Sequence, residues 1–282
     1  PVTRAPRNRY QHPAITVKPA MTIKVCVRLI AVAAYLLFGV LLAFVIGMFF
    51  VRFTVWQRPV IAWWLRGFCR VLNMQVTVQG APIEDSALWI SNHVSWMDIP
   101  VIGGIRPLRF LSKAEVAQWP VIGRLAQAAG TLFIKRGSGD ADRVSEEMVL
   151  SLQQGKRVLF FPEGTTTDGF SVNRFFAKLF TAATKSQCLI QPLVICYQTA
   201  DGQLHAMAPF IGDDELAPHL LNMLAGEPVH VRVHCLPAEV AGDRDASALA
   251  RHFEQLMGPT LRDLHGAEQP PSRGDHPATK AA

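Results

Sequence analysis

Residues 87–100 read ALWISNHVSWMDIP, the pattern of a buried strand, a tight connection and the beginning of a helix. The run ALWIS carries no charge and is bounded by polar residues, as a short buried strand is. Pro100 lacks a backbone N–H and therefore fits the first turn of a helix, so we predict that this helix begins near Asp98. A strand that leads into a helix is the repeating unit of α/β domains.

The same alternation continues on both sides of this unit. We predict further strands at residues 75–79, 108–111, 131–135, 157–161, 189–197 and 229–235, and helices at 140–154, 173–184, 214–225 and 245–264. Together they predict one α/β domain over residues 75–264, with a central, mostly parallel or mixed sheet flanked by helices. Residues 265–282 are rich in Pro, Gly and charge, which predicts a disordered tail.

An uncharged apolar run precedes this domain at residues 29–51, between Arg28 and Arg52. As a helix it measures roughly 35 Å, which is enough to cross the hydrocarbon core of a membrane. A buried core helix is the alternative, but apolar residues cover every face of the run. Basic residues flank both ends, so the sequence leaves open whether the helix spans the membrane or dips into one leaflet.

Residues 59–74 place three large aromatic side chains, Trp63, Trp64 and Phe68, among Arg66 and Arg70. This pattern predicts a helix in the membrane interface, or alternatively an amphipathic helix packed on the domain. We therefore predict a two-helix membrane-attachment segment over residues 29–74, after a mobile basic arm over residues 1–28.

Charge is divided unevenly along the chain. Residues 1–83 contain ten Lys and Arg and no Asp or Glu, whereas the remainder has 18 Lys and Arg against 22 Asp and Glu. Basic residues beside an apolar run attract anionic lipid headgroups, while nucleic-acid binding requires a basic surface on the folded domain. We expect membrane lipids as partners and no nucleic acid.

His93 and Asp98 lie five positions apart, between the predicted strand and the predicted helix. An Asp at the beginning of a helix can accept the Nδ1 proton of a loop His, which leaves Nε2 as a base for an attacking alcohol. Taken alone, Asp98 is also an ordinary helix N-cap and His93 an ordinary loop residue. The pair therefore requires support from other segments.

Three later segments supply that support: GTLFIKR at residues 130–136, FPEGT at 161–165 and IQPLV at 190–194. With Asn92, His93 and Asp98 they stand in the order and approximate spacing of the four motifs of the lysophosphatidate acyltransferase family of glycerolipid acyltransferases. The resemblance covers roughly residues 75–240. It implies that His93 is the general base, that Asp98 orients it and that Arg136 contacts the anionic headgroup of the acceptor.

The same resemblance implies that Glu163, Gly164 and Thr165 help to form the acceptor site. For a phosphate headgroup a second cation is needed, and Lys113, after the strand at residues 108–111, is a candidate. In one respect the chain departs from the family, in which Arg commonly follows the Thr of the third motif, whereas Thr166 stands here. The absence of this cation puts phosphate specificity in question.

The implied reaction moves a fatty acyl group from acyl-carrier protein or acyl-coenzyme A, the acyl donor carrier, directly to the free hydroxyl of a lysolipid. The implied acceptor is 1-acylglycerol-3-phosphate, giving phosphatidic acid, with lyso-ornithine lipid as the alternative. We expect no cofactor and no metal, and a place at the bacterial inner membrane with the catalytic domain on the cytoplasmic side. A non-catalytic, membrane-tethered lipid-binding protein is the alternative from another class.

Overall fold

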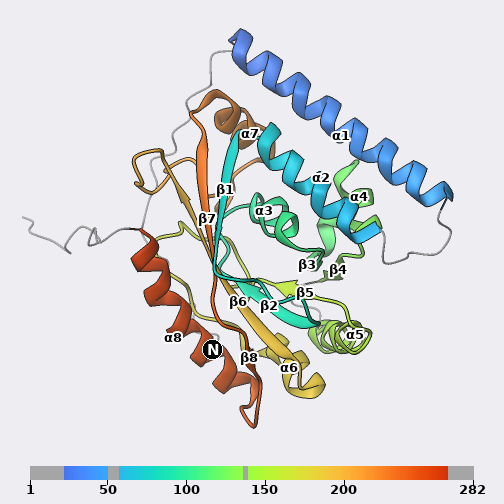
Figure 1. Ribbon diagram of the computed structural model, residues 1–282, viewed down its shortest axis with the longest axis vertical. Helices are drawn as coiled ribbons and strands as arrows, with labels where there is room; N and C mark the ends of the chain where they lie inside the picture. The colour runs from blue at the N-terminus through green and yellow to red at the C-terminus, as the bar shows by residue number, and fades with distance from the viewer. Residues whose placement is uncertain (1–21, 50–56, 136–138, 266–282) are drawn as a thin grey trace, which may run out of the picture.

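The computed structural model describes residues 22–49, 57–135 and 139–265, and in these residues eight strands form one sheet (Figure 1). The spatial order is β1-β7-β6-β2-β5-β3-β4, and β8 pairs with β6. The strands are β1 (Met74–Gln79), β2 (Ala87–Ser91), β3 (Arg109–Lys113), β4 (Leu132–Ile134), β5 (Val158–Phe160), β6 (Leu189–Gln198), β7 (Val229–Cys235) and β8 (Glu239–Val240).

The sheet is mixed, as the sequence predicts. Neighbours from β6 through β2, β5 and β3 to β4 run parallel, whereas β7 and β8 run antiparallel to β6. β1 pairs in parallel with β7. β2 is buried along its whole length between β5 and β6, so the residues that follow it leave the sheet near its centre.

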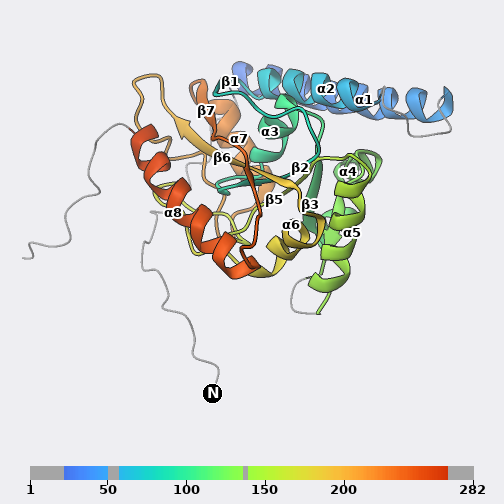
Figure 2. The ribbon, with the colours of Figure 1, turned by 60° about the horizontal axis from the view of Figure 1, so that its bottom comes forward.

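Helices cover both faces of the sheet. They are α1 (Ile23–Phe49), α2 (Gln57–Val71), α3 (Asp98–Ile105), α4 (Ile122–Ala128), α5 (Ala141–Gln153), α6 (Thr181–Ser186), α7 (Leu216–Ala225) and α8 (Ala246–Leu264), with 3₁₀ turns η1 (Ala114–Gln118) and η2 (Ala177–Phe180). Figure 2 shows α1 and α2 along one side of the sheet and α8 along the other. The predicted architecture, a central sheet flanked by helices, is confirmed.

Two apolar clusters follow from the alternation of side chains along the buried strands. Leu88 and Ile90 of β2 face one cluster, which includes the buried faces of α5, α6 and α8. Trp89, between them in the sequence, faces the other cluster, which includes residues of α1, α2, α3 and α7. The core therefore consists of two layers, one on each face of the sheet.

α1 begins six residues earlier than the apolar run predicts, so residues 23–28 belong to the helix rather than to the predicted arm. Thr22 Oγ1 accepts a hydrogen bond from the Val25 N–H at 3.3 Å, which caps the first turn. Arg28 is accommodated because its guanidinium donates to the carbonyls of Leu224 (2.7 Å) and Gly226 (3.1 Å) at the end of α7. Residues 1–21, 50, 51 and 266–282 of the predicted arm, apolar run and tail lie outside the described residues.

α1 is, among the described residues, the one helix long and apolar enough to cross a membrane. It lies beside α2 (Figure 1). Between these two helices, the Tyr35 hydroxyl donates to the Trp64 carbonyl at 3.0 Å, and the Tyr35 ring stacks on the Trp64 ring. Cys69 of α2 and Leu72, just after the helix, are buried in the same cluster as Trp89. The predicted boundary at residue 75 therefore cuts through a packed unit, because α2 and the sheet share one core.

The segment predicted as one helix at residues 173–184 forms two shorter elements, η2 and α6, after a stretch without regular secondary structure. Its first backbone N–H groups are bonded to side chains, not to helix carbonyls: Asn173 N–H donates to Glu163 and Phe175 N–H to Glu254, each at 2.8 Å. These long-range bonds replace the first helical turn. The short elements η1 and α4 between β3 and β4 were not predicted either.

Candidate active site

His93 and Asp98 meet in the connection between β2 and α3. The Nδ1 atom of His93 lies 2.7 Å from Asp98 Oδ2, and the same oxygen accepts from the backbone N–H groups of Val94 (2.8 Å) and Ser95 (3.1 Å). Because the carboxylate acts as the acceptor, Nδ1 carries the hydrogen and Nε2 is the nitrogen with a free lone pair. α3 begins at Asp98 with Pro100 in its first turn, as predicted.

Tyr197 of β6 completes this arrangement, although nothing in our interpretation of the sequence singled it out. Its hydroxyl donates to Asp98 Oδ1 at 2.6 Å, and both side chains are buried. Burial raises the pKa of Tyr197 well above its ordinary value, so the hydroxyl remains a donor at neutral pH. A tyrosine buried in a strand of the sheet requires a hydrogen-bond partner, which is the signal that could have identified it.

The ring and the backbone of His93 are also held by the third motif. The imidazole stacks on Phe161 with ring centroids 3.8 Å apart and an angle of 10° between the planes. The His93 N–H donates to Glu163 Oε1 at 2.8 Å, and its carbonyl accepts from the Thr167 N–H at 2.8 Å. The loop that carries His93 is therefore tied to the segment after β5 at three points.

Glu163 is fully engaged in this support. Its second oxygen, Oε2, accepts from the Asn173 N–H, and the side chain is only 2% exposed. Burial raises the pKa of Glu163 to about 7, and the two N–H donors act in the opposite direction. The carboxylate thus binds two backbone segments of the protein, and Glu163 also lines the cavity that contains His93. That Glu163 helps to form the acceptor site stays a prediction.

The two residues after Glu163 shape the wall beside it. Gly164 has a φ of 66°, a left-handed conformation, and a Cβ there would lie 3.1 Å from the Phe176 ring. Thr165 and Thr166 line the same cavity as His93. The predicted acceptor turn is therefore at the cavity, with glycine required for its backbone shape and for the close approach of Phe176.

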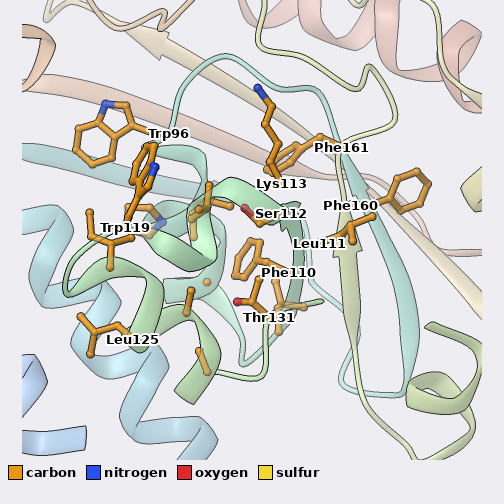
Figure 3. Close-up of a pocket in the computed structure, with 18 of the residues that line it drawn as sticks. Trp96, Phe110, Leu111, Ser112, Lys113, Trp119, Leu125, Thr131, Phe160 and Phe161 are labelled. Atoms are coloured by element: carbon orange, nitrogen blue, oxygen red, sulfur yellow. The ribbon is translucent and has the colours of Figure 1, made fainter. Parts of the chain in front are cut away.

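A cavity of about 1340 Å³ extends from His93 between the helices and the sheet. Its wall is mostly apolar and draws on α1, α2, α3, α4 and α7 as well as β3. Figure 3 shows aromatic side chains around it, among them Trp96, Phe110, Trp119 and Phe161. Such a space suits a long hydrocarbon chain in contact with a few polar groups.

The cations predicted for the acceptor headgroup are only partly described. Lys113, at the end of β3, is exposed and lines the cavity (Figure 3). Arg136 lies outside the described residues, next to Lys135, which also lines the cavity. A third wall residue, Lys178, forms an ion pair with Asp142 at 2.9 Å.

Known proteins with related sequences now decide the family. The model of the family described as Acyltransferase matches residues 74–196. The chain is 45% identical over 195 residues to the lyso-ornithine lipid O-acyltransferase of Pseudomonas aeruginosa, an alignment that covers 69% of this chain and 75% of the relative. This chain belongs to the Acyltransferase family.

One further relative of the acyltransferase and one solved structure broaden the comparison. The 1-acyl-sn-glycerol-3-phosphate acyltransferase of Neisseria meningitidis is 31% identical over 204 residues, 70% of this chain and 79% of the relative. The crystal structure of the 1-acyl-sn-glycerophosphate (LPA) acyltransferase of Thermotoga maritima has the same fold, with a TM-score of 0.64 at 18% identity. It covers 88% of this chain and 100% of the other. The family, fold class and enzyme class predicted from the sequence are confirmed.

Proposed function

We propose that this acyltransferase moves a fatty acyl group from a thioester carrier to the free hydroxyl of a lysolipid, with His93 as the general base. The observation that carries the proposal is the His93–Asp98 pair, in which Nδ1 is engaged and Nε2 is available, with His93 in the wall of a mostly apolar cavity. Nε2 takes the proton of the acceptor hydroxyl, whose oxygen attacks the thioester carbonyl carbon.

A tetrahedral intermediate follows. As it collapses, the carbon–sulfur bond breaks, the new carbon–oxygen ester bond remains, and the proton on Nε2 passes to the departing thiolate. Asp98 stabilises the imidazolium that forms between these two proton transfers and keeps the ring in one orientation. The reaction requires no acyl group on the protein, so no serine or cysteine acts as a nucleophile.

For the acceptor we propose a lyso-ornithine lipid. An ornithine with an acylated α-amine carries one carboxylate and one ammonium near neutral pH, whereas a phosphate monoester carries close to two negative charges. On the described part of the cavity wall, Lys178 is paired with Asp142, and neutral Thr166 stands where the family commonly has Arg. A single lysine such as Lys113 suffices for a carboxylate, and the similarity to the Pseudomonas aeruginosa enzyme supports the same acceptor.

The second candidate is 1-acylglycerol-3-phosphate, which the sequence favours as the acceptor. The Neisseria meningitidis relative, named for this substrate, supports it. We rank it second because the lyso-ornithine relative is the more similar of the two.

We also propose that α1 attaches the enzyme to the bacterial inner membrane, with the catalytic domain on the cytoplasmic side. Much of α1 is apolar and exposed, including Leu37 (70%) and Phe44 (65%), and such a surface is unfavourable in water. α1 also contributes to the cavity wall, so a lipid chain can pass between membrane and cavity without crossing water. Acyl-carrier protein or acyl-coenzyme A, both cytoplasmic, would supply the acyl group.

Competition between the two acceptors for one labelled acyl donor tests the acceptor assignment. We expect the purified wild type to acylate lyso-ornithine lipid in preference to 1-acylglycerol-3-phosphate. Thr166→Arg adds a cation to the wall and should shift the ratio toward the phosphate by about tenfold, while Thr166→Val, a neutral change of similar volume, should not. A wild-type preference for the phosphate acceptor would overturn the assignment.

A further inference from the structure

A buried histidine outside the four motifs joins three segments of the site. His219 of α7 is 8% exposed, and its Nδ1 accepts from the indole Nε1–H of Trp96 at 3.1 Å. Its Nε2 lies 3.2 Å from the carbonyl oxygen of Pro209. The ring of Phe210 packs edge-on against the imidazole, with centroids 5.2 Å apart.

The chemistry of these partners fixes the state of His219. An indole N–H only donates and a carbonyl oxygen only accepts, so Nδ1 must be unprotonated and Nε2 must carry the hydrogen. Burial lowers the pKa of His219, which agrees with a neutral ring. Both nitrogens are thus used in bonds of opposite polarity, and each bond holds a different segment.

The segments that His219 holds are in, or bonded to, the connection that carries His93 and Asp98. Trp96 lies between His93 and Asp98 in the same connection, and its side chain lines the cavity (Figure 3). The Phe210 N–H donates to the Val94 carbonyl at 3.0 Å, so the segment that contains Phe210 is tied to the same connection. Phe210 lines the cavity as well.

The part of the wall formed here is apolar. It consists of Trp96 and Phe210 together with Leu216 and Leu220 of α7, and His93 lines the same cavity. Without the bond to His219, the indole of Trp96 could turn about its side-chain torsions, because nothing else in the described residues binds its N–H. Such a turn would change the shape of the cavity next to the reacting atoms.

We infer that His219 is a positioning residue: it fixes the indole of Trp96 and thereby the path of a long acyl chain past His93. The inference rests on the proposed acyl transfer and adds a determinant of chain recognition to it. His219 acts through Trp96 and does not touch the substrate. A short-chain substrate that does not reach this wall is insensitive to it, whereas a long-chain substrate depends on it.

The test compares long-chain and short-chain acyl thioesters as donors, with the purified full-length enzyme in detergent. His219→Phe keeps the ring but loses both hydrogen bonds, and it should lower kcat/KM for the long-chain donor by about tenfold and for the short-chain donor by less than about twofold. His219→Gln retains one acceptor and one donor, so it should remain within about threefold of the wild type for both donors. Thermal melting establishes that each variant is folded.

His234→Phe is the matched control, because its strand neighbours Val233 and Cys235 face the cluster that contains α7 and its own side chain faces the other side of the sheet. If His219→Phe does not fold, Trp96→Phe replaces it, since it removes the indole N–H while keeping an aromatic ring in the wall. We expect the same chain-length selectivity from it. Three results would overturn the inference. They are equal losses with both donors, equal losses in His219→Phe and His219→Gln, or wild-type kinetics in both His219→Phe and Trp96→Phe. A wild type without acyl transfer to any lysolipid would instead refute the proposed function.

Discussion

Replacement of Glu163 by Gln tests whether Glu163 supports His93 or binds the acceptor. The carboxylate accepts two backbone N–H groups, one from His93 and one from Asn173, each at 2.8 Å. A Gln side chain has one acceptor oxygen and one amide group that only donates. In Glu163→Gln, one of the two buried N–H groups therefore faces another donor and loses its partner.

The magnitude follows from that lost partner. A buried N–H left without an acceptor costs about 1–3 kcal/mol, which lowers the melting temperature measurably. If the His93 N–H is the one released, the imidazole shifts relative to the acceptor hydroxyl. We expect kcat to fall by about 10- to 100-fold, while KM for the acceptor stays within about threefold.

Glu254→Gln is the control for this experiment. Glu254 holds the N–H of Phe175 at 2.8 Å through one oxygen, so Gln can make the same bond. Steady-state kinetics with varied acceptor should therefore show near wild-type values for this variant. A Glu163→Gln enzyme with an unchanged kcat and a strongly raised KM for the acceptor would refute the reasoning. That result would indicate that Glu163 binds the acceptor.

Three further predictions follow from the same geometry. Asp98→Asn presents an amide in place of a carboxylate to four donors, and kcat should fall by about 10²- to 10⁴-fold in initial-rate assays; a loss below about threefold would contradict this. Gly164→Ala places a Cβ at φ 66° and 3.1 Å from Phe176, so unfolding should become easier by about 1 kcal/mol or more, whereas an unchanged melting temperature would argue against the observed turn. Because burial raises the pKa of Glu163 to about 7, its contribution to stability is greatest below about pH 4.5 and is lost as pH rises through about 7. The melting temperature of the wild type relative to Glu163→Gln should thus decrease between these values, and a constant difference would contradict the raised pKa.

Local patterns predicted the central strands well. β2 and β7 have the predicted bounds because each is a short run with a clear pattern, fully buried in β2 and alternating in β7. The beginnings of α3 and α8 were also visible: Asp98 and Pro100 mark the first, and Asp245 caps the second by accepting from the Ala248 N–H at 2.7 Å. These features depend only on neighbouring residues.

Features that depend on distant residues were not visible in the sequence. The sequence predicts a helix that begins at Asn173, yet Glu163 and Glu254 bind the N–H groups of Asn173 and Phe175, and residues 173–176 form no helix. The bond from Tyr197 to Asp98 joins residues 99 positions apart. The resemblance to a known family identified His93 and Asp98, but a motif gives the type of residue and not its partners, so the support that Glu163 gives to His93 required the structure.

The central claim, that His93 removes the proton from a lysolipid hydroxyl, is tested most directly by the transfer of a labelled acyl group. Wild-type enzyme and His93→Ala are compared in detergent with a labelled acyl thioester and lyso-ornithine lipid. Thermal melting first establishes that both proteins are folded under the assay conditions. The account predicts that the wild type forms the doubly acylated lipid with no label on the protein in a single turnover, and that His93→Ala is slower by about 10²- to 10⁴-fold. Transfer by a folded His93→Ala enzyme at the wild-type rate, or a labelled acyl group on the protein during turnover, would contradict it.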